Sequence, residues 1–332
     1  MYIIRTLEIC LINTSEAEPV NDARTSQIIP YSGRANTPIP QQFGFSDMLT
    51  TNIRPRRSLI FVPGNKPEWF PKALKYGADV VCVDLEDAIA PHQKDAAREA
   101  TLTLFDDYKN KSQPECVVRI NSLRSADGMR DVMGILERTR PPPALMLTKV
   151  KSSDEVCQLE ELLTAPPHDS IRFHVIIETN DGLEAAYQIA QSSRRIDSLL
   201  FGGVDMSAEL RTNLDWENLL YARSRLVHAA AGANIDLIDV PSLDLEDIEG
   251  LEKAAKASAG LGFTGKAAIH PKQVPVINTW FSPSAKAIAE ARKIVEAFES
   301  SKDGLVVVDG KLLERPVLRS MHRILAIADR IR

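Results

Sequence analysis

The chain has 332 residues, of which 44% are hydrophobic and 26% are charged, and its formal net charge is -5 at pH 7. This length is sufficient for one large α/β domain or two smaller ones. The acidic balance argues against a general binder of nucleic acids or of anionic membranes. The sequence contains no run of about 18 apolar residues, so it predicts no membrane-spanning helix.

The cysteines indicate a reducing environment. Cys10, Cys82, Cys116 and Cys157 fit no metal-ligand spacing. Cys82 and Cys116 lie inside apolar runs, where a thiol behaves as a small hydrophobic side chain. We therefore expect a cytoplasmic protein.

The first 53 residues differ from the remainder of the chain. The apolar segment 1–12 is interrupted by Arg5 and Glu8, and residues 14–52 are polar with scattered prolines. The acidic residues argue against a transit peptide, and no clean cleavage site indicates a signal peptide. We expect an irregular N-terminal arm over residues 1–53.

From Arg57 onward, short apolar runs alternate with amphipathic segments of helical length. Runs that are apolar throughout are typical of parallel strands buried on both faces. Eight such units in about 240 residues match a (β/α)8 TIM barrel. A doubly wound sheet is the alternative, but no G-x-G-x-x-G follows the first run. The predicted strands are Ser58–Val62, Val80–Asp84, Cys116–Ile120, Leu145–Val150, Phe173–Glu178, Leu199–Gly203, Ile235–Val240 and Ala267–His270.

Three of the intervening segments carry helix start or stop signals. Ser152 followed by Glu155 predicts a capping box. A helical pattern begins after Asp215 and is predicted to end at Gly232. The segment 244–262, "DLEDIEGLEKAAKASAGLG", has the same organisation.

Carboxylates follow the fifth and sixth predicted strands. Glu178 closes the fifth strand in "VIIETNDG", and Asp205 lies just past the sixth in "LLFGGVD". Catalytic groups of such barrels lie at the strand ends, and adjacent strands are about 4.8 Å apart, so both carboxylates can converge on one ion. Two hard oxygen ligands, completed by water and substrate, are typical of Mg²⁺. The alternative is that both acids cap the helices that follow.

The second strand ends in a group of acids, "DLED", which contains Asp84, Glu86 and Asp87. We expect Glu86 or Asp87 to pair with Lys94 or Arg98 and so to stay ionised. The alternative is that the acids interact with the dipole of the next helix, which accounts for some of them only.

Arg119 ends the third strand in "VVRINS". The fork of a guanidinium matches a substrate carboxylate. A structural salt bridge from Arg119 to Glu86 is the competing interpretation.

Other residues suggest different chemistry. Lys149 and Lys266 lie near strands, which leaves a Schiff-base aldolase open. The spacing of "GLGFTGK" resembles a phosphate loop, but Ala267 replaces the expected Ser or Thr and the element order is reversed. His270 ends the last strand, where it either contacts substrate or is packed.

Many of these motifs occur together, in order, in one known family. The segment 56–98, "RRSLIFVPGNKPEWFPKALKYGADVVCVDLEDAIAPHQKDAAR", resembles the opening of the citrate lyase beta-subunit-like proteins. These are relatives of malyl-CoA and citramalyl-CoA lyases within the HpcH/HpaI aldolase superfamily. The resemblance continues through "VVRINS", "LTKV", "IIETNDGLEAA", "LLFGGVDMSAEL", "GFTGKAAIHPKQV" and "VVVDGKLLERPVLRSMHRILAIA".

The resemblance implies roles for individual residues. The magnesium carboxylates fall on Glu178 and Asp205, and the carboxylate-binding arginine falls on Arg119. Asp84 is implied to order metal-bound water. The acid that is usually an aspartate, delivered from a neighbouring subunit, falls on Glu314, which keeps the carboxyl group and adds one methylene.

We therefore expect an arm over 1–53, a barrel domain over 54–300, and a C-terminal helical extension over 301–332 that contributes to a neighbouring subunit's site. The resemblance implies a homo-oligomer, either a trimer or a hexamer.

The implied reaction is cleavage of a 3-hydroxyacyl-CoA, such as citramalyl-CoA or malyl-CoA, into acetyl-CoA and a 2-oxo acid. Mg²⁺ would act as a Lewis acid on the hydroxyl group. Arg119 and backbone N–H groups near Gly202 and Gly203 would hold developing negative charge, and Glu314 would protonate the enolate. The alternatives are a citrate lyase beta subunit acting on a carrier thioester within a complex, and a non-catalytic barrel. The identity of the 2-oxo acid stays open.

Overall fold

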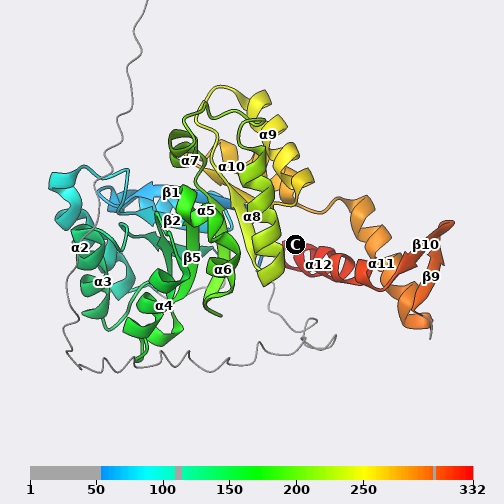
Figure 1. Ribbon diagram of the computed structural model, residues 1–332, viewed down its shortest axis with the longest axis horizontal. Helices are drawn as coiled ribbons and strands as arrows, with labels where there is room; N and C mark the ends of the chain where they lie inside the picture. Colours follow the sequence, from blue (N-terminus) through cyan, green and yellow to red (C-terminus); the bar gives the residue numbers. More distant parts are fainter. Residues whose placement is uncertain (1–53, 109–113, 302–303, 332) are drawn as a thin grey trace, which may run out of the picture. The chain divides into compact units, whose positions relative to one another are not determined.

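Eight parallel strands form the centre of the computed structural model (Figure 1). The structure describes residues 54–108, 114–301 and 304–331, so the expected arm over 1–53 lies outside the described residues. The strands are β1 Ser58–Pro63, β2 Val80–Asp84, β3 Glu115–Arg119, β4 Ala144–Leu147, β5 Arg172–Ile177, β6 Ile196–Phe201, β7 Asp236–Asp239 and β8 Gly265–Ala268.

The strands close into a barrel, because each pairs with the next and β8 pairs with β1. This result confirms the predicted barrel over a doubly wound sheet. The register places Asp84, the last residue of β2, opposite Arg119 at the end of β3. The last residues of β5 and β6 are also partners, so Glu178 and Gly202, which follow them directly, are neighbours at the carboxyl edge.

The strands are buried on both faces, as their continuous apolar runs predict. Side chains on the outward face pack against the helices, whereas a second apolar cluster consists of strand residues alone and therefore fills the barrel interior. This interior cluster contains Leu59, Val80, Cys82, Val117, Ala144, Met146, Ile176, Leu200, Ile238 and Ala267, with Phe61 packed against it.

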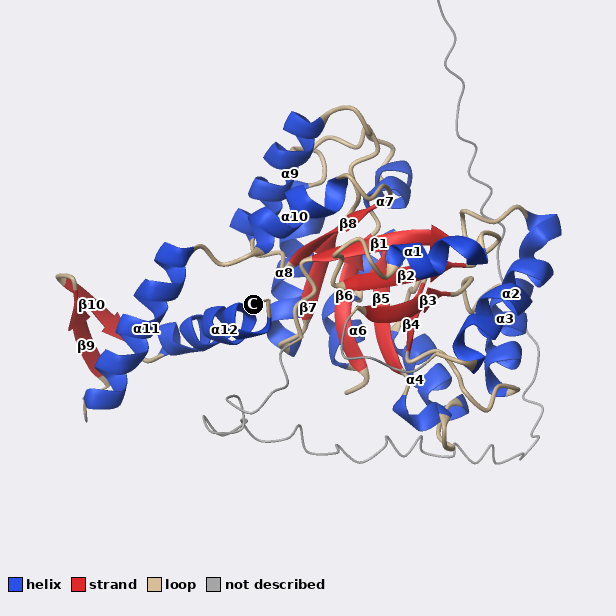
Figure 2. Cartoon of the chain, turned by 180° about the vertical axis from the view of Figure 1, so that it is seen from behind, coloured by secondary structure: helices blue, strands red, loops and turns tan. Residues whose placement is uncertain are grey.

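Helices surround the strands (Figure 2). No helix in the described ranges is long and apolar enough to cross a membrane. The helices between and after the barrel strands are α1 Phe70–Ala73, α2 Lys94–Asp106, α3 Ala126–Leu136, α4 Ser153–Leu162, α5 Asn180–Glu184, α6 Ala186–Gln191, α7 Gly203–Glu209, α8 Leu220–Ala233, α9 Ile248–Leu261 and α10 Gln273–Phe281.

Two of the predicted helices differ in how well the sequence located their ends. For α9 the predicted end is confirmed, because Gly262 terminates it with a left-handed φ of 117°, whereas the first turn is capped by Asp247 rather than by Asp244 at the start of the predicted segment. Helix α8 does not begin beside Asp215, because turns intervene. It ends at Asn234, which adopts φ 56°, rather than at Gly232, because asparagine also tolerates the left-handed conformation.

The predicted capping box at α4 is wrong. Ser152 is the N-cap residue, but its side chain makes no capping hydrogen bond. The Glu155 carboxylate accepts instead from the N–H of Lys151, one residue before the N-cap, and from Arg124. Hydrogen bonds from the Arg124 guanidinium and the Lys151 N–H therefore replace the reciprocal hydrogen bonds expected between Ser152 and Glu155.

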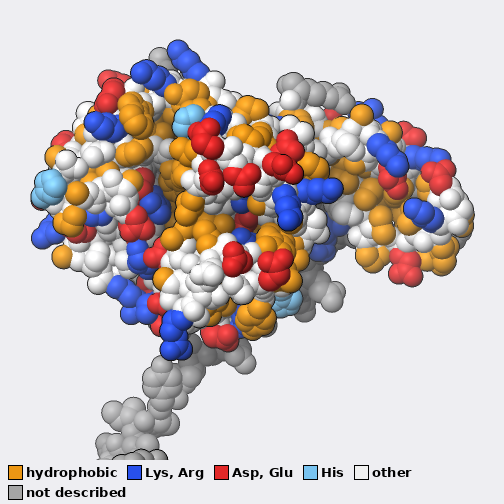
Figure 3. Space-filling model, turned by 90° about the horizontal axis from the view of Figure 1, so that it is seen from above, with side chains coloured by type: hydrophobic (Ala, Val, Ile, Leu, Met, Phe, Trp, Pro, Cys, Tyr) orange, Lys and Arg blue, Asp and Glu red, His pale blue; other side chains and the backbone are white. Residues whose placement is uncertain are grey.

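The C-terminal elements form an extension that projects from the barrel (Figure 1). They comprise α11 Ala285–Ser300, β9 Leu305–Val308, β10 Lys311–Glu314 and α12 Pro316–Arg330, and the two strands form an antiparallel hairpin. Helices α11 and α12 share a small apolar cluster with the hairpin. Leu305, Val307 and Leu312 are exposed on the hairpin, and Figure 3 shows hydrophobic side chains gathered over this extension.

A buried ionic network lies at the amino ends of the strands. Arg56 donates to Glu115 (Nε to Oε2, 2.6 Å), to Asp236 (2.9 Å) and to Asp197 (2.8 Å). Arg323 of α12 also donates to Asp236, so this network links the C-terminal extension to the barrel. We call Arg56, Glu115, Asp197, Asp236 and Arg323 the amino-end network.

Candidate active site

A cavity of about 650 Å³ opens at the carboxyl ends of the strands. Its walls are largely apolar and include Phe61, Ile176 and Leu200 from the barrel interior. Five of the predicted site residues line it together: Asp84, Arg119, Glu178, Gly202 and Asp205. The barrel therefore places these residues, which are distant in sequence, around one open cavity.

Sequence reasoning missed the rim of this cavity, to which Trp69, Lys72 and Tyr76 contribute. These residues follow β1, and their position after a strand end is the signal that could have identified them. His270 also lines the cavity and is exposed, so the interpretation of a packed histidine is wrong. The backbone N–H of Lys272 donates to His270 Nδ1 at 3.2 Å, which leaves Nε2 as the donor in the neutral ring.

Glu178 follows β5 and is buried. One of its oxygens, Oε1, accepts from the backbone N–H of Lys149 at 2.7 Å. The side chain of Thr179, not that of Glu178, caps α5 by accepting from the N–H of Gly182 at 3.0 Å. The alternative that Glu178 is a helix cap is therefore wrong, and its carboxylate faces the cavity.

Gly202 makes room for this carboxylate. A Cβ atom at Gly202 would lie 2.4 Å from the Glu178 Cβ and 2.5 Å from its Oε2, closer than nonbonded atoms approach. The N–H of Gly202 donates to the Ile177 carbonyl at 3.1 Å, so it is engaged within the barrel. The predicted role of this N–H in holding substrate charge would require it to exchange partners. Gly203 opens α7, where the first N–H groups have no intrahelical acceptor.

The surroundings of Glu178 disfavour its ionised form. Burial raises the pKa of this carboxyl group, and the negative charges of Asp205 and Glu86 raise it further, to about 8. A cation placed beside Glu178 would remove this penalty. The raised pKa therefore marks a position where positive charge is favoured.

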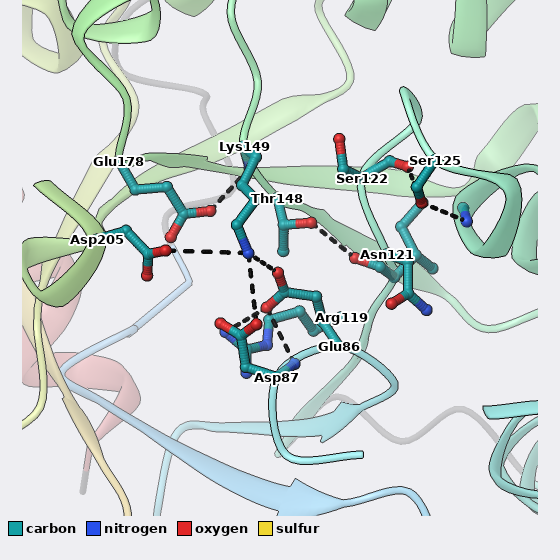
Figure 4. Close-up of polar contacts among 12 residues, drawn as sticks. Glu86, Asp87, Arg119, Asn121, Ser122, Ser125, Thr148, Lys149, Glu178 and Asp205 are labelled. Carbon is teal, nitrogen blue, oxygen red and sulfur yellow. Dashed lines mark hydrogen bonds and ion pairs between the residues drawn. The ribbon is translucent and has the colours of Figure 1, made fainter. Parts of the chain in front are cut away.

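Asp205 lies in the first turn of α7, three residues after its N-cap. This position fits the alternative of an acid at a helix N-terminus. The side chain is nevertheless directed toward the same space as Glu178, and its Oδ1 lies 3.9 Å from the Lys149 Nζ (Figure 4). Asp205 therefore lies in the same group of acids as Glu178, which we call the acid cluster, and its place in the first turn also allows an interaction with the dipole of α7.

The ammonium group of Lys149 lies between the acids of different strands (Figure 4). It donates to Glu86 and lies 3.4 Å from Asp87 Oδ1. Burial alone would lower the pKa of Lys149, but Glu86 and Asp87 raise it well above its usual range. A Schiff-base lysine must lose its proton to attack, so this environment disfavours the imine route.

Lys266, the other candidate for an imine, is buried and already engaged. Its Nζ lies 2.9 Å from Asp239 Oδ2 and 2.6 Å from the Val240 carbonyl. These contacts fix it outside the acid cluster as part of a structural ion pair.

The guanidinium of Arg119 makes a bidentate interaction with the carboxylate of Asp84. The Nε–Oδ1 distance is 2.7 Å and the Nη2–Oδ2 distance is 2.6 Å. Nη1 lies 3.2 Å from Glu86 Oε2, so the competing salt bridge is present alongside the pair with Asp84. The guanidinium also covers the ring of Phe61 at 4.9 Å. Binding of a substrate carboxylate by Arg119 and ordering of water by Asp84 stay predictions.

The predicted pairing of Glu86 or Asp87 with Lys94 or Arg98 is wrong. Lys94 donates to two backbone carbonyls of the loop between β2 and α2, and Arg98 donates to Asp131 at 2.6 Å. Both cations start from α2, but only Lys94 holds the loop, through its backbone carbonyls, whereas Arg98 pairs with the carboxylates of Asp131 and Asp95.

Glu314 does not meet the other predicted residues within this chain. It ends β10, is exposed, and is not among the described residues that line the cavity. Figure 1 shows β10 at the far end of the C-terminal extension. Its predicted role would require a neighbouring subunit.

The residues at the cavity base fit a magnesium ion. Among the described residues, no group of three or more Asp, Glu, His or Cys side chains is arranged to hold a metal by itself. Mg²⁺ is commonly held by one or two carboxylates, with water and substrate oxygens completing its octahedron. Glu178 and Asp205 match this donor set, and the raised pKa of Glu178 indicates a place for a cation.

Comparison with known proteins identifies the family. A family model described as HpcH/HpaI aldolase/citrate lyase matches residues 57–271. The chain belongs to the HpcH/HpaI aldolase/citrate lyase family. The match extends from β1 to the turn after β8, which is the whole barrel.

Several relatives with known names align with most of this chain. The citrate lyase subunit beta of Leuconostoc mesenteroides subsp. cremoris is 32% identical, over 84% of this chain and 95% of the relative. An L-malyl-CoA/beta-methylmalyl-CoA lyase of Cereibacter sphaeroides is 34% identical, over 84% and 96%. The mitochondrial citramalyl-CoA lyase of Rattus norvegicus is 28% identical, over 87% and 90%. The predicted lyase class is thereby confirmed.

A solved relative shares the fold. The protein CitE of Mycobacterium tuberculosis, crystallised with magnesium, acetoacetate and coenzyme A, is 30% identical and superposes with a TM-score of 0.67. The similarity covers 84% of this HpcH/HpaI family chain and 99% of CitE.

Proposed function

We propose that this protein is a Mg²⁺-dependent carbon–carbon lyase that cleaves a 3-hydroxyacyl-CoA of the citramalyl-CoA or malyl-CoA type. The products are acetyl-CoA and a 2-oxo acid. The observation that carries the proposal is the convergence of Glu178 and Asp205 at the base of a cavity of about 650 Å³. The names of the curated relatives and the magnesium-bound CitE support the substrate class and the metal.

Glu178 and Asp205 would hold the ion. When bound, Mg²⁺ supplies a Lewis acid for the hydroxyl group and the adjacent carboxylate of the substrate. The apolar walls formed by Phe61, Ile176 and Leu200 exclude water from the acyl portion and strengthen electrostatic interactions around it.

Arg119 would balance negative charge as it develops on the substrate. The carboxylate of Asp84 holds the guanidinium of Arg119 and fixes the orientation of that guanidinium before substrate binds. A substrate carboxylate would interact with the face of the guanidinium that opens to the cavity. The first N–H groups of α7, beginning at Gly203, provide further positive potential.

Glu314 of a neighbouring subunit would supply the proton for the enolate carbon of the acetyl-CoA product. Its position at the end of β10 and its exposure support delivery to another copy rather than to its own cavity. The exposed Leu305, Val307 and Leu312 on the same hairpin support coverage by another subunit. We therefore propose a homo-oligomer, a trimer or a hexamer. The free thiols of Cys82 and Cys116 support a cytoplasmic location.

The test is a thioester panel with the purified full chain. Citramalyl-CoA and malyl-CoA are supplied separately, with magnesium or with excess EDTA, and acetyl-CoA release is measured. We expect magnesium-dependent cleavage of at least one of them without any partner protein. Cleavage of neither thioester, or full activity in excess EDTA, would overturn the proposal.

The alternative is a citrate lyase beta subunit that acts on a citryl thioester within a multi-subunit complex. It is favoured by the likeness to the citrate lyase subunit beta of Leuconostoc mesenteroides. Cleavage of citryl carrier thioester, together with inactivity on both CoA thioesters above, would favour this alternative. Co-purification with a carrier protein would add to it.

A further inference from the structure

Lys149 occupies an unusual backbone conformation in the loop after β4. Its φ is 53°, in the left-handed region, which costs a residue with a Cβ atom roughly 1–2 kcal/mol. In this conformation its N–H points at the Glu178 carboxylate, at 2.7 Å. Glycine or asparagine would relieve the strain, so the lysine side chain has a separate reason to be at this position.

That reason lies in the contacts of the ammonium group. It donates to Glu86, lies 3.4 Å from Asp87 Oδ1 and lies 3.9 Å from Asp205 Oδ1. Figure 4 shows Glu178 and Asp205 on one side of this group and Glu86 and Asp87 on the other. Lys149 therefore connects the acids that follow β2 with those that follow β5 and β6.

The charges around the cavity base are unbalanced. Five carboxylates, two of them from the loop after β2, face two cations there. Arg119 is engaged by Asp84 and Glu86. Lys149 is consequently the cation that faces Glu178 and Asp205, and it occupies the edge of the space where a divalent ion would bind.

We propose that Lys149 is a positioning residue that also weakens the hold of the site on its divalent ion. Its ammonium group keeps the loop acids Glu86 and Asp87 next to the metal carboxylates, and its charge repels an ion held by Glu178 and Asp205. This inference rests on the proposed function, in which those two carboxylates hold Mg²⁺. The consequence is an ion that exchanges readily and a site that stays assembled when the ion leaves.

Lys149→Met tests this inference, because it keeps the length of the side chain and the backbone N–H but removes the charge. Mn²⁺ binding to the substrate-free full-length protein is measured by titration calorimetry and by the signal of free Mn²⁺ in electron paramagnetic resonance. We expect Lys149→Met to bind Mn²⁺ about tenfold more tightly than wild type, because a positive charge within a few ångströms is removed. Lys149→Arg keeps the charge and should stay within about threefold of wild type.

Lys151→Met is the matched control. Lys151 lies two residues further along the same loop, but its Nζ pairs with the exposed Asp181 at 3.0 Å rather than with the cluster. Its substitution should leave the Mn²⁺ affinity unchanged. Turnover gives a second readout: Lys149→Met should combine tighter metal binding with a lower kcat, whereas a merely disrupted site would lose both.

A folded Lys149→Met protein that binds Mn²⁺ with equal or lower affinity would overturn the inference. If that variant fails to fold, Lys149→Gln is measured in its place. Failure of both neutral variants to fold, without rescue by Mn²⁺, would also overturn it, since tighter metal binding must stabilise the folded state. If Glu178→Ala binds Mn²⁺ as well as wild type does, the proposed function itself fails; if it loses the ion while Lys149→Met is unaltered, the inference alone fails.

Discussion

The two ends of the barrel both carry buried charged clusters, but their charges are balanced differently. At the amino end, Arg56 donates to three acids, and Arg54, Arg172 and Arg323 each pair with one of the same acids. At the carboxyl end, acids outnumber the cations Arg119 and Lys149. The clusters use the same residue types, so their difference lies in which charges are left without a partner.

The different charge balance shifts the pKa values of two buried glutamates, Glu115 and Glu178, in opposite directions. Burial would raise the pKa of Glu115, but His174 and Arg56 hold it well below its usual range. Burial also raises the pKa of Glu178, and there the neighbouring acids Asp205 and Glu86 raise it further, to about 8. The amino-end acids are paired within the chain, whereas Glu178 at the carboxyl end has acidic neighbours whose charge the proposed magnesium ion would balance. We call the amino end the structural end and the carboxyl end, which carries the proposed active site, the functional end.

The largest expected effect is on the functional end. Glu178→Ala or Asp205→Ala removes a carboxylate that would hold magnesium, so we expect cleavage to fall by about a thousandfold or more. Acetyl-CoA release measures the effect, and circular dichroism checks that the fold persists. An active variant that still requires magnesium would show that the ion is held elsewhere.

The matching change at the structural end should affect stability. Arg56→Met leaves the buried Glu115 and Asp236 and the partly buried Asp197 without their shared cation, and we expect the free energy of unfolding to fall by about 3–5 kcal/mol. Urea denaturation measures the change. Arg130→Ala removes an exposed pair with Asp127 and should cost less than about 0.5 kcal/mol. Equal losses for Arg56→Met and Arg130→Ala would remove the distinction between the ends.

A smaller effect is expected from Gly202→Ala, because the new methyl group would collide with Glu178. We expect the Mn²⁺ affinity to fall by about 10- to 100-fold, the usual loss when the groups that orient a metal ligand are altered. Gly260→Ala is the control, since a Cβ atom at Gly260 in α9 meets nothing within 4 Å. That change should leave metal binding unaltered and slightly stabilise the helix. Unchanged Mn²⁺ binding by Gly202→Ala would contradict the close packing of Gly202 against Glu178.

The smallest effect is a pH dependence of metal binding. Since the pKa of Glu178 is raised to about 8, its carboxyl group holds a proton at lower pH that an arriving cation must displace. The Mn²⁺ affinity should therefore rise by up to about tenfold per pH unit toward pH 8 and level off above it. Calorimetry in buffers of different ionisation enthalpy should detect about one released proton at pH 7 and fewer at pH 9. An affinity independent of pH between 6 and 9 would contradict the raised pKa.

The sequence was informative where burial acts on consecutive residues. All eight strands were located, because strands buried on both faces leave continuous apolar runs. Glu178 was located as well, because an acid directly after such a run falls at the carboxyl edge. Helix ends were less predictable: the segment after Asp215 has a helical pattern, yet turns precede α8.

Side-chain partners within the site were not predictable, because they depend on contacts between distant segments. The pair of Arg119 with Asp84 follows from the register of β2 and β3. The position of Lys149 depends on a left-handed backbone conformation that lysine rarely adopts. Lys94 is close to the acids in sequence but approaches the loop from behind, so sequence proximity was misleading.

Closure of the barrel has a consequence for how the chain is made. Ser58 of β1 pairs opposite Lys266 of β8, so the first strand has no partner on one side until most of the polypeptide has been synthesised. Contacts between such distant segments form late and slowly. During that interval the edge of β1 that will meet β8 is unpaired, and unpaired strand edges favour aggregation of partly folded chains.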